Sequence, residues 1–179
     1  MIRSLRDEAL LLLDGRGAIL EVARRMSAIL RDRAVDGAVI GGVAVVLHGH
    51  VGTTMDVELF VRNRGDTLKQ DLLDTGLQFD ATNKEFKLQD VPVHLVFADT
   101  IGSCPNHFIE VDGVQTVSLA DLINMKLESG CRDPLRAQDL ADVIGLIRCH
   151  GLTGDFAGRL GNPVRAEFRK LARAIHGKP

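Results

Sequence analysis

The order of the apolar segments along this chain restricts it to a mixed α/β fold. Apolar residues recur at helical spacing over 17–31, whereas 38–40 and 56–61 are short apolar runs typical of buried strands. Between these two strands, residues 43–48 are apolar, short and followed by Gly49, which predicts a brief helix. A strand, a short helix and a second strand in succession indicate a sheet with helical connections.

The rest of the chain changes gradually from strands to helices. A helix is expected over 66–75, two or three strands over 77–97 (the clearest at 91–97) and another strand at 114–117. Beyond residue 118 the pattern is helical. The sequence therefore predicts an α/β or α+β fold in three parts: an N-terminal helical segment (1–34), an α/β core (35–117) and a C-terminal helical segment packed on the core (118–179).

Local signals mark where two of the C-terminal helices begin. Ser118 and Asp121 have the spacing of a capping box, in which side chains satisfy the free N–H groups of a first helical turn. Asn162 and Pro163 are typical of the cap and first turn of the last helix.

Composition excludes several classes of function. A net charge of −2 argues against a broad nucleic-acid-binding face, and without Trp or Tyr the chain lacks the usual platforms for stacking bases. Three cysteines without a Cys-x-x-Cys spacing indicate reduced thiols and a cytoplasmic protein, not a disulfide frame or a zinc site. No apolar run approaches the ~18 residues of a membrane span, and residues 1–17 are expected to be a helix, not a signal peptide.

Two acids interrupt the second predicted strand. Asp56 and Glu58 are two residues apart, so their side chains leave the same face of the strand while Val57 and Leu59 point the other way. Two neighbouring carboxylates repel unless a cation lies between them, and a magnesium ion with one or two carboxylates and substrate phosphates is the simplest solution. A solvated strand edge would carry the same residues.

A glycine pair precedes these acids at the end of the first strand. Gly41 and Gly42 offer bare backbone N–H groups and a helix N-terminus to a phosphate, although such a pair is also typical of a simple turn. A glycine turn upstream of metal-holding acids fits phosphoryl or nucleotidyl transfer.

Five segments in this order resemble the nucleotidyltransferase superfamily. The likeness is to small stand-alone bacterial members related to abortive-infection toxins and antibiotic nucleotidyltransferases, and it covers roughly residues 35–150. The segments are VIGGVAVVLHG (39–49), TTMDVELFV (53–61), VPVHLVFAD (91–99), VQTVSLADLINMKLESG (114–130) and PLRAQDLADVIGLI (134–147). The fold that the resemblance implies is a twisted mixed sheet flanked by helices.

The resemblance also implies roles for individual residues. Asp56 and Glu58 would be the catalytic acids that hold Mg²⁺ or Mn²⁺, and His94 stands where the family has a third metal-binding carboxylate. A nucleoside triphosphate would be the substrate. Its phosphates would be held by four residues: Gly41, Gly42, Thr54 and Lys126. Lys126 could equally be a solvated helix residue.

Three positions depart from the family pattern. Glu58 replaces an Asp, Gly52 replaces an Arg, and His94 replaces the third carboxylate. Neutral His suits zinc or manganese better than magnesium, and a His in a strand is more commonly hydrogen-bonded in the interior. Neither Asp90, about 13 Å along the same strand, nor Asp99, on the opposite face, can easily replace the missing acid.

These departures leave three functions open. The first is transfer of a nucleoside monophosphate to an acceptor, which could be a small molecule, a protein or an RNA. The second is a catalytically silent binding module, since a fold does not fix a function. The third is a toxin with an antitoxin partner.

Overall fold

The computed structural model describes residues 11, 16–52, 54–63 and 68–177. The helix expected over residues 1–17 falls mostly outside these residues, as do the first two residues of the helix expected over 66–75. Thr53, the first residue of the TTMDVELFV motif, is also outside them.

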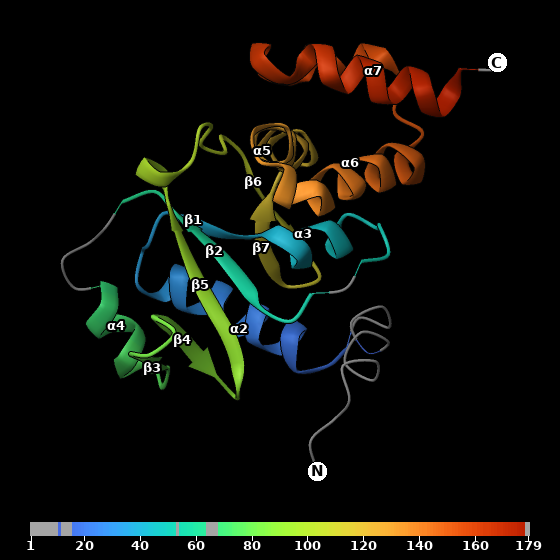
Figure 1. The fold of residues 1–179 in the computed structure, drawn as a ribbon. Helices are drawn as coiled ribbons and strands as arrows, with labels where there is room; N and C mark the ends of the chain where they lie inside the picture. Colours follow the sequence, from blue (N-terminus) through green and yellow to red (C-terminus); the bar gives the residue numbers. More distant parts are fainter. Residues whose placement is uncertain (1–10, 12–15, 53, 64–67, 178–179) are drawn as a thin grey trace.

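The described strands form one mixed sheet in the order β3-β4-β5-β2-β1-β7-β6 (Figure 1). Strand β1 pairs antiparallel with β2 and parallel with β7, and β2 pairs parallel with β5. The bounds of the strands are β1 Gly37–Ile40, β2 Val57–Val61, β3 Gln78–Asp80, β4 Glu85–Leu88, β5 Val91–Phe97, β6 Phe108–Val111 and β7 Val114–Val117.

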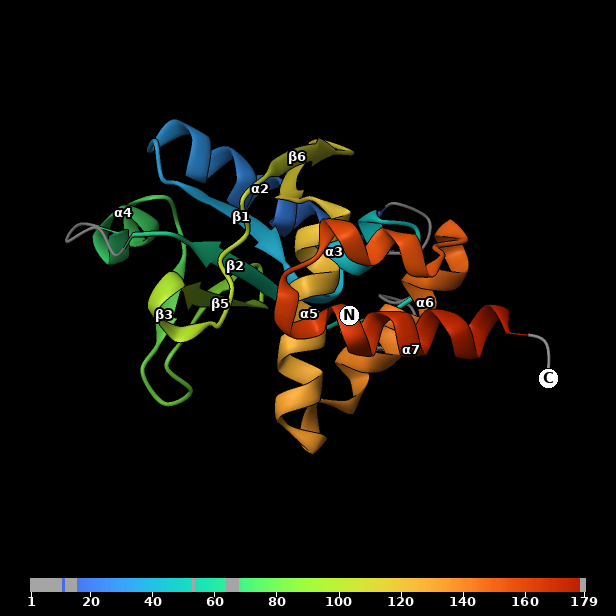
Figure 2. The same cartoon turned by 90° about the horizontal axis from the view of Figure 1, so that it is seen from above.

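Helices cover both faces of this sheet. Helices α2 and α4 lie against one face, and α5, α6 and α7 are stacked over the other. Seen from above, α4 and β3 lie at one end of the sheet, away from the C-terminal helices (Figure 2). The bounds are α2 Ala18–Asp32, α3 Gly41–Leu47, α4 Leu68–Asp74, α5 Leu119–Arg132, α6 Ala137–His150 and α7 Arg165–His176. No helix in the described part of the chain is both long and apolar enough to cross a membrane.

The alternation of β2 divides the hydrophobic core in two. Val57, Leu59 and Val61 are fully buried in the cluster that α2 covers. Phe60 points the other way, into the cluster formed with α5, α6 and α7. Glu58 shares the face of Phe60 because side chains alternate along a strand, so its carboxylate lies on the side of the C-terminal helices.

Several element boundaries differ from the prediction. Strand β2 begins at Val57, so Asp56 lies just before the strand, and α3 begins at Gly41 itself. Strand β6 was not predicted. The last helix begins at Arg165, after a short 3-10 turn at Asn162–Val164.

The predicted capping of α5 is confirmed. The backbone N–H of Asp121 donates to Ser118 Oγ at 3.2 Å, and the Ser118 hydroxyl donates to Asp121 Oδ2 at 2.8 Å. The Asp121 carboxylate also accepts the backbone N–H of His107, which ties the start of α5 to the residue just before β6.

Candidate functional site

Glu58 lies at the centre of the sheet, opposite two neighbouring strands. The register pairs it with Ile40 on β1 and with His94 on β5. Its carboxylate rests against Gly41, where any side chain would overlap it. Gly41 has φ +68°, a conformation that also favours glycine. The first glycine of the pair therefore makes room for the Glu58 carboxylate.

Asp56 is held by Thr54 in the segment before β2. The Thr54 hydroxyl donates to Asp56 Oδ1 at 2.9 Å. Thr54 in turn packs on Gly42, where an added Cβ would come within 2.6 Å of the Thr54 Cβ. The glycine pair thus contacts both acidic positions, one directly and one through Thr54.

The two acids interact electrostatically. Burial and the negative charge of Asp56 raise the pKa of Glu58, and the positive charges of Lys126 and Arg136 offset this only in part. Because the charged form of Glu58 is disfavoured, the site would gain stability from a cation.

His94 lies beside Asp56, as its place in the motif predicts. Its Nε2 is 3.5 Å from Asp56 Oδ2 and 3.5 Å from Glu85 Oε2, and 41% of the side chain is exposed. The interpretation of His94 as an interior histidine was therefore wrong: β5 is open to solvent at this point of the sheet.

Lys126 lies on α5 between two carboxylates of α6. Its Nζ is 2.7 Å from Asp139 Oδ1 and 2.8 Å from Asp142 Oδ2. Burial works to lower the pKa of Lys126, but these hydrogen bonds outweigh it and keep the pKa above its usual range. Lys126 is therefore a buried member of an ion-pair network with Asp139 and Asp142, not a solvated helix residue.

A pocket of about 350 Å³ opens between the sheet and the C-terminal helices. Gly41 and Glu58 lie on its sheet side, Lys126 and Arg132 on α5, and Arg136 at the start of α6. The segment 100–103 forms a further wall, where the Ser103 hydroxyl donates to the Glu128 carboxylate. The helices after residue 118 thus close one side of the site.

The residues expected to bind metal are brought together only in pairs. Asp56 neighbours Glu58 and, separately, His94. Among the residues that the structure describes, no group of three His, Cys, Asp or Glu side chains could hold a metal ion. Two carboxylates nevertheless fit Mg²⁺ or Mn²⁺ that arrives with a nucleotide, because the phosphates and water supply the other ligands.

Three residues near the site were not predicted from the sequence. Ser103 and Arg132 line the pocket, and Glu85 approaches His94 from β4. Gly52, in place of the family's arginine, lies against Val45 and Val46 of α3.

Comparison with known proteins identifies the fold of the chain. No protein-family model and no curated protein matches the chain. Among solved structures, a nucleotidyltransferase-like antigenic protein from Paracoccidioides brasiliensis aligns with a TM-score of 0.57 at 16% identity, covering 96% of this chain and 99% of that one. JHP933 from Helicobacter pylori aligns with a TM-score of 0.53 at 15% identity, covering 87% and 90%. The protein therefore has a nucleotidyltransferase-like fold, as its motifs predicted.

Proposed function

We propose that the protein binds a nucleoside triphosphate with a divalent metal and transfers a nucleoside monophosphate to an acceptor. The observation that carries this proposal is the position of Glu58. Its carboxylate lies on the pocket wall, against Gly41, with Asp56 as its acidic neighbour and the positive charge of Arg136 acting on it from the turn before α6. A carboxylate and a guanidinium that line one pocket, with a second carboxylate beside the first, suit a substrate that carries both a metal ion and phosphates.

The phosphates would lie between the glycine pair and the arginines at the pocket mouth. Gly41 lines the pocket, and Thr54 packs on Gly42 and supports the loop through Asp56. Arg136 Nε forms an ion pair with Asp139 Oδ2 at 2.9 Å. Because half of the Arg136 side chain is exposed, its guanidinium can turn toward a phosphate. Lys126 would act through its buried pairs with Asp139 and Asp142, which fix the α6 end of the pocket.

The metal would be held by Asp56 and Glu58. When bound, Mg²⁺ or Mn²⁺ would neutralise phosphate charge that develops as the acceptor oxygen bonds the α-phosphorus and pyrophosphate leaves. His94 can contribute a nitrogen ligand that favours Mn²⁺ over Mg²⁺. The protein residues would orient the triphosphate and exclude water from the Ile40 and Leu122 side of the pocket.

Calorimetric titration tests this proposal. Each of the four common nucleoside triphosphates would be added with Mg²⁺ or Mn²⁺ to the wild-type protein and to Asp56→Asn. We expect saturable, metal-dependent binding to the wild type that is weakened about 10-fold or more in the variant. Equal binding with and without metal would contradict the assignment of Asp56.

A second candidate, a nucleotide-binding module without transferase activity, is favoured by two features of the site. Lys126 is occupied by two carboxylates, and Gly52 supplies no cation beside α3. Binding without any release of pyrophosphate would support this candidate. We expect binding to survive better than turnover, and His94→Asp to raise a weak transferase rate by restoring an acid.

The acceptor and an antitoxin partner stay predictions from the sequence. A small molecule, a protein side chain and an RNA end all present the hydroxyl or phosphate oxygen that this reaction requires.

A further inference from the structure

The proposed metal site has one carboxylate fewer than the three that the family resemblance implies. Asp56 and Glu58 supply two carboxylates, and His94, between them and β4, is an imidazole. Magnesium and manganese bound with a triphosphate are favoured by further acidic groups close by, because electrostatics dominates this chemistry. An acid elsewhere in the fold could make up the difference.

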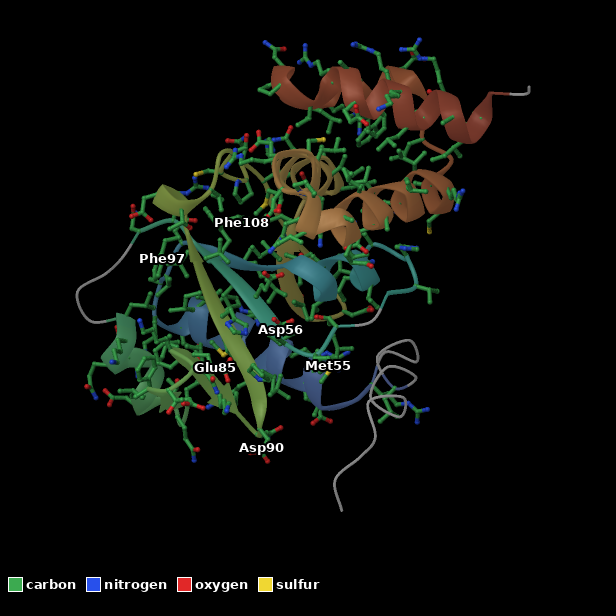
Figure 3. The ribbon with its side chains drawn as sticks, in the orientation of Figure 1. Met55, Asp56, Glu85, Asp90, Phe97 and Phe108 are labelled. Carbon is green, nitrogen blue, oxygen red and sulfur yellow. The ribbon has the colours of Figure 1, made fainter. Side chains whose placement is uncertain are left out.

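Glu85 is placed to do so from the neighbouring strand. The antiparallel register that pairs Phe86 with Val93 brings Glu85 beside His94, so both side chains leave the same face of the sheet. Glu85 Oε2 lies 3.5 Å from His94 Nε2, the same nitrogen that is 3.5 Å from Asp56 Oδ2. Figure 3 labels the two acids, Asp56 and Glu85, on either side of β5. The two carboxylates therefore flank one imidazole.

A tight turn fixes this register. Leu88 pairs with Val91, and the two residues between them, Gln89 and Asp90, have φ +53° and +65°. Two left-handed residues in a two-residue loop are the pattern of a type I′ hairpin, which holds its strands in one alignment. Glu85 thus reaches His94 because of the turn at 89–90.

The carboxylate of Glu85 is divided between two neighbours. Oε1 lies 3.2 Å from Lys87 Nζ, whereas Oε2 faces His94. Lys87 has a closer partner in Asp80, at 2.9 Å, and is therefore not dependent on Glu85. Only 12% of the Glu85 side chain is exposed, so its charge is screened less than that of a surface acid.

We propose that Glu85 is a positioning residue of the metal site: it supplies the third negative charge from β4 and, together with Asp56, flanks the Nε2 atom of His94. This inference rests on the proposed function. It replaces the acid missing from β5 with one from the next strand, which acts through His94 and not as a direct ligand. The site then has three carboxylates: Asp56, Glu58 and Glu85.

The test measures Mn²⁺ affinity by electron paramagnetic resonance, in the presence of the nucleotide that the wild type binds best. We expect Glu85→Gln to weaken Mn²⁺ binding about 10-fold, as loss of an outer partner of a metal site does. Glu85→Asp keeps the charge and should restore most of the affinity. Adding His94→Asp to Glu85→Gln should also restore it, which a purely structural role of Glu85 would not predict.

Glu110→Gln is the matched control. It makes the same substitution at another ion-paired glutamate of the sheet, which lies on β6 and pairs with Arg31 outside the site, and it should change Mn²⁺ affinity less than about twofold. The inference is overturned if Glu85→Gln binds Mn²⁺ like the wild type, or if Glu110→Gln weakens binding equally. If the wild type binds no nucleotide with Mn²⁺, the proposed function fails and takes this inference with it.

Discussion

At the scale of single residues, Glu58 is held in a costly environment. Burial and the charge of Asp56 both disfavour the ionised form of Glu58, and only a glycine at position 41 leaves room for its carboxylate. Perturbed acids of this kind gather at functional sites, where affinity for a charged ligand offsets the loss of stability. The cost itself can be measured.

Glu58→Gln should stabilise the metal-free protein near neutral pH. The folded-state pKa of Glu58 is raised above the ordinary value of 4.5. Its contribution to stability is therefore complete below that value and is lost as pH rises through the raised pKa. The thermal midpoint of Glu58→Gln, followed by circular dichroism in EDTA, should exceed that of the wild type near neutral pH and approach it toward pH ~4. A lower midpoint at neutral pH would mean that Lys126 and Arg136 compensate fully.

Gly41→Ala should damage the site more than the fold. Both Gly41 and Gly76 have positive φ, so Ala costs roughly 1–2 kcal/mol of backbone strain at either. At Gly76 no atom lies within 4 Å of the added methyl, whereas at Gly41 the methyl displaces Glu58. We expect denaturant titration to give a larger loss for Gly41→Ala, and calorimetry to give lost metal–nucleotide binding for Gly41→Ala alone. Unchanged binding in Gly41→Ala would remove Glu58 from the site.

At the scale of elements, the sequence predicted most of the helices and central strands, because their apolar periodicity follows from burial. Strand β6 was missed because it is an edge strand with half-exposed residues and no clear alternation. Its turn did carry a signal: Asp112 and Gly113, both with positive φ, form the Asp-Gly pair that favours a type I′ hairpin.

The candidate site was predicted only as far as it lies on contiguous segments. The spacing of Asp56, Glu58 and the glycine pair made them candidates, and the resemblance implied their roles. Glu85 could not, because its place beside His94 depends on a Gln-Asp turn that is far from the favoured Asn-Gly. The resemblance indicated Lys126 as a candidate, but its two carboxylate partners could not be predicted because they depend on how α5 packs on α6.

Replacing Gln89-Asp90 with Asn-Gly should stabilise the β4–β5 hairpin. Glycine and asparagine adopt positive φ at lower cost, so we expect the free energy of unfolding to rise by about 0.5–1 kcal/mol. Denaturant titration followed by circular dichroism measures this directly. Gly113→Ala, in the other two-residue hairpin, should change stability in the opposite direction. A destabilised Asn-Gly variant would show that Gln89 or Asp90 makes contacts that outweigh the turn.

At the scale of the whole molecule, one sheet packs against a hydrophobic cluster on each of its faces and carries the candidate site on one of them. The cluster under α5 runs from Ala38 and Phe60 on the sheet through α6 to Phe168 on α7. The pocket lies within this stack, between the sheet and α5. The C-terminal helices should therefore unfold together with the sheet, and a destabilising substitution on α7 should lower the stability of the entire chain.

Phe168→Ala tests this coupling. Phe168 is fully buried and packs on Phe156 with ring centres 5.6 Å apart, so its loss should cost roughly 3–5 kcal/mol. Phe79→Ala on the edge strand β3 is the control, because 37% of that residue is exposed and its loss should cost about 1 kcal/mol. Circular dichroism is the suitable probe, since the chain has no Trp or Tyr. We expect one transition in urea, shifted as a whole by Phe168→Ala because α7 shares its core with β1 and β2. Two separate transitions, with only the first moved, would mean that α7 folds apart from the sheet.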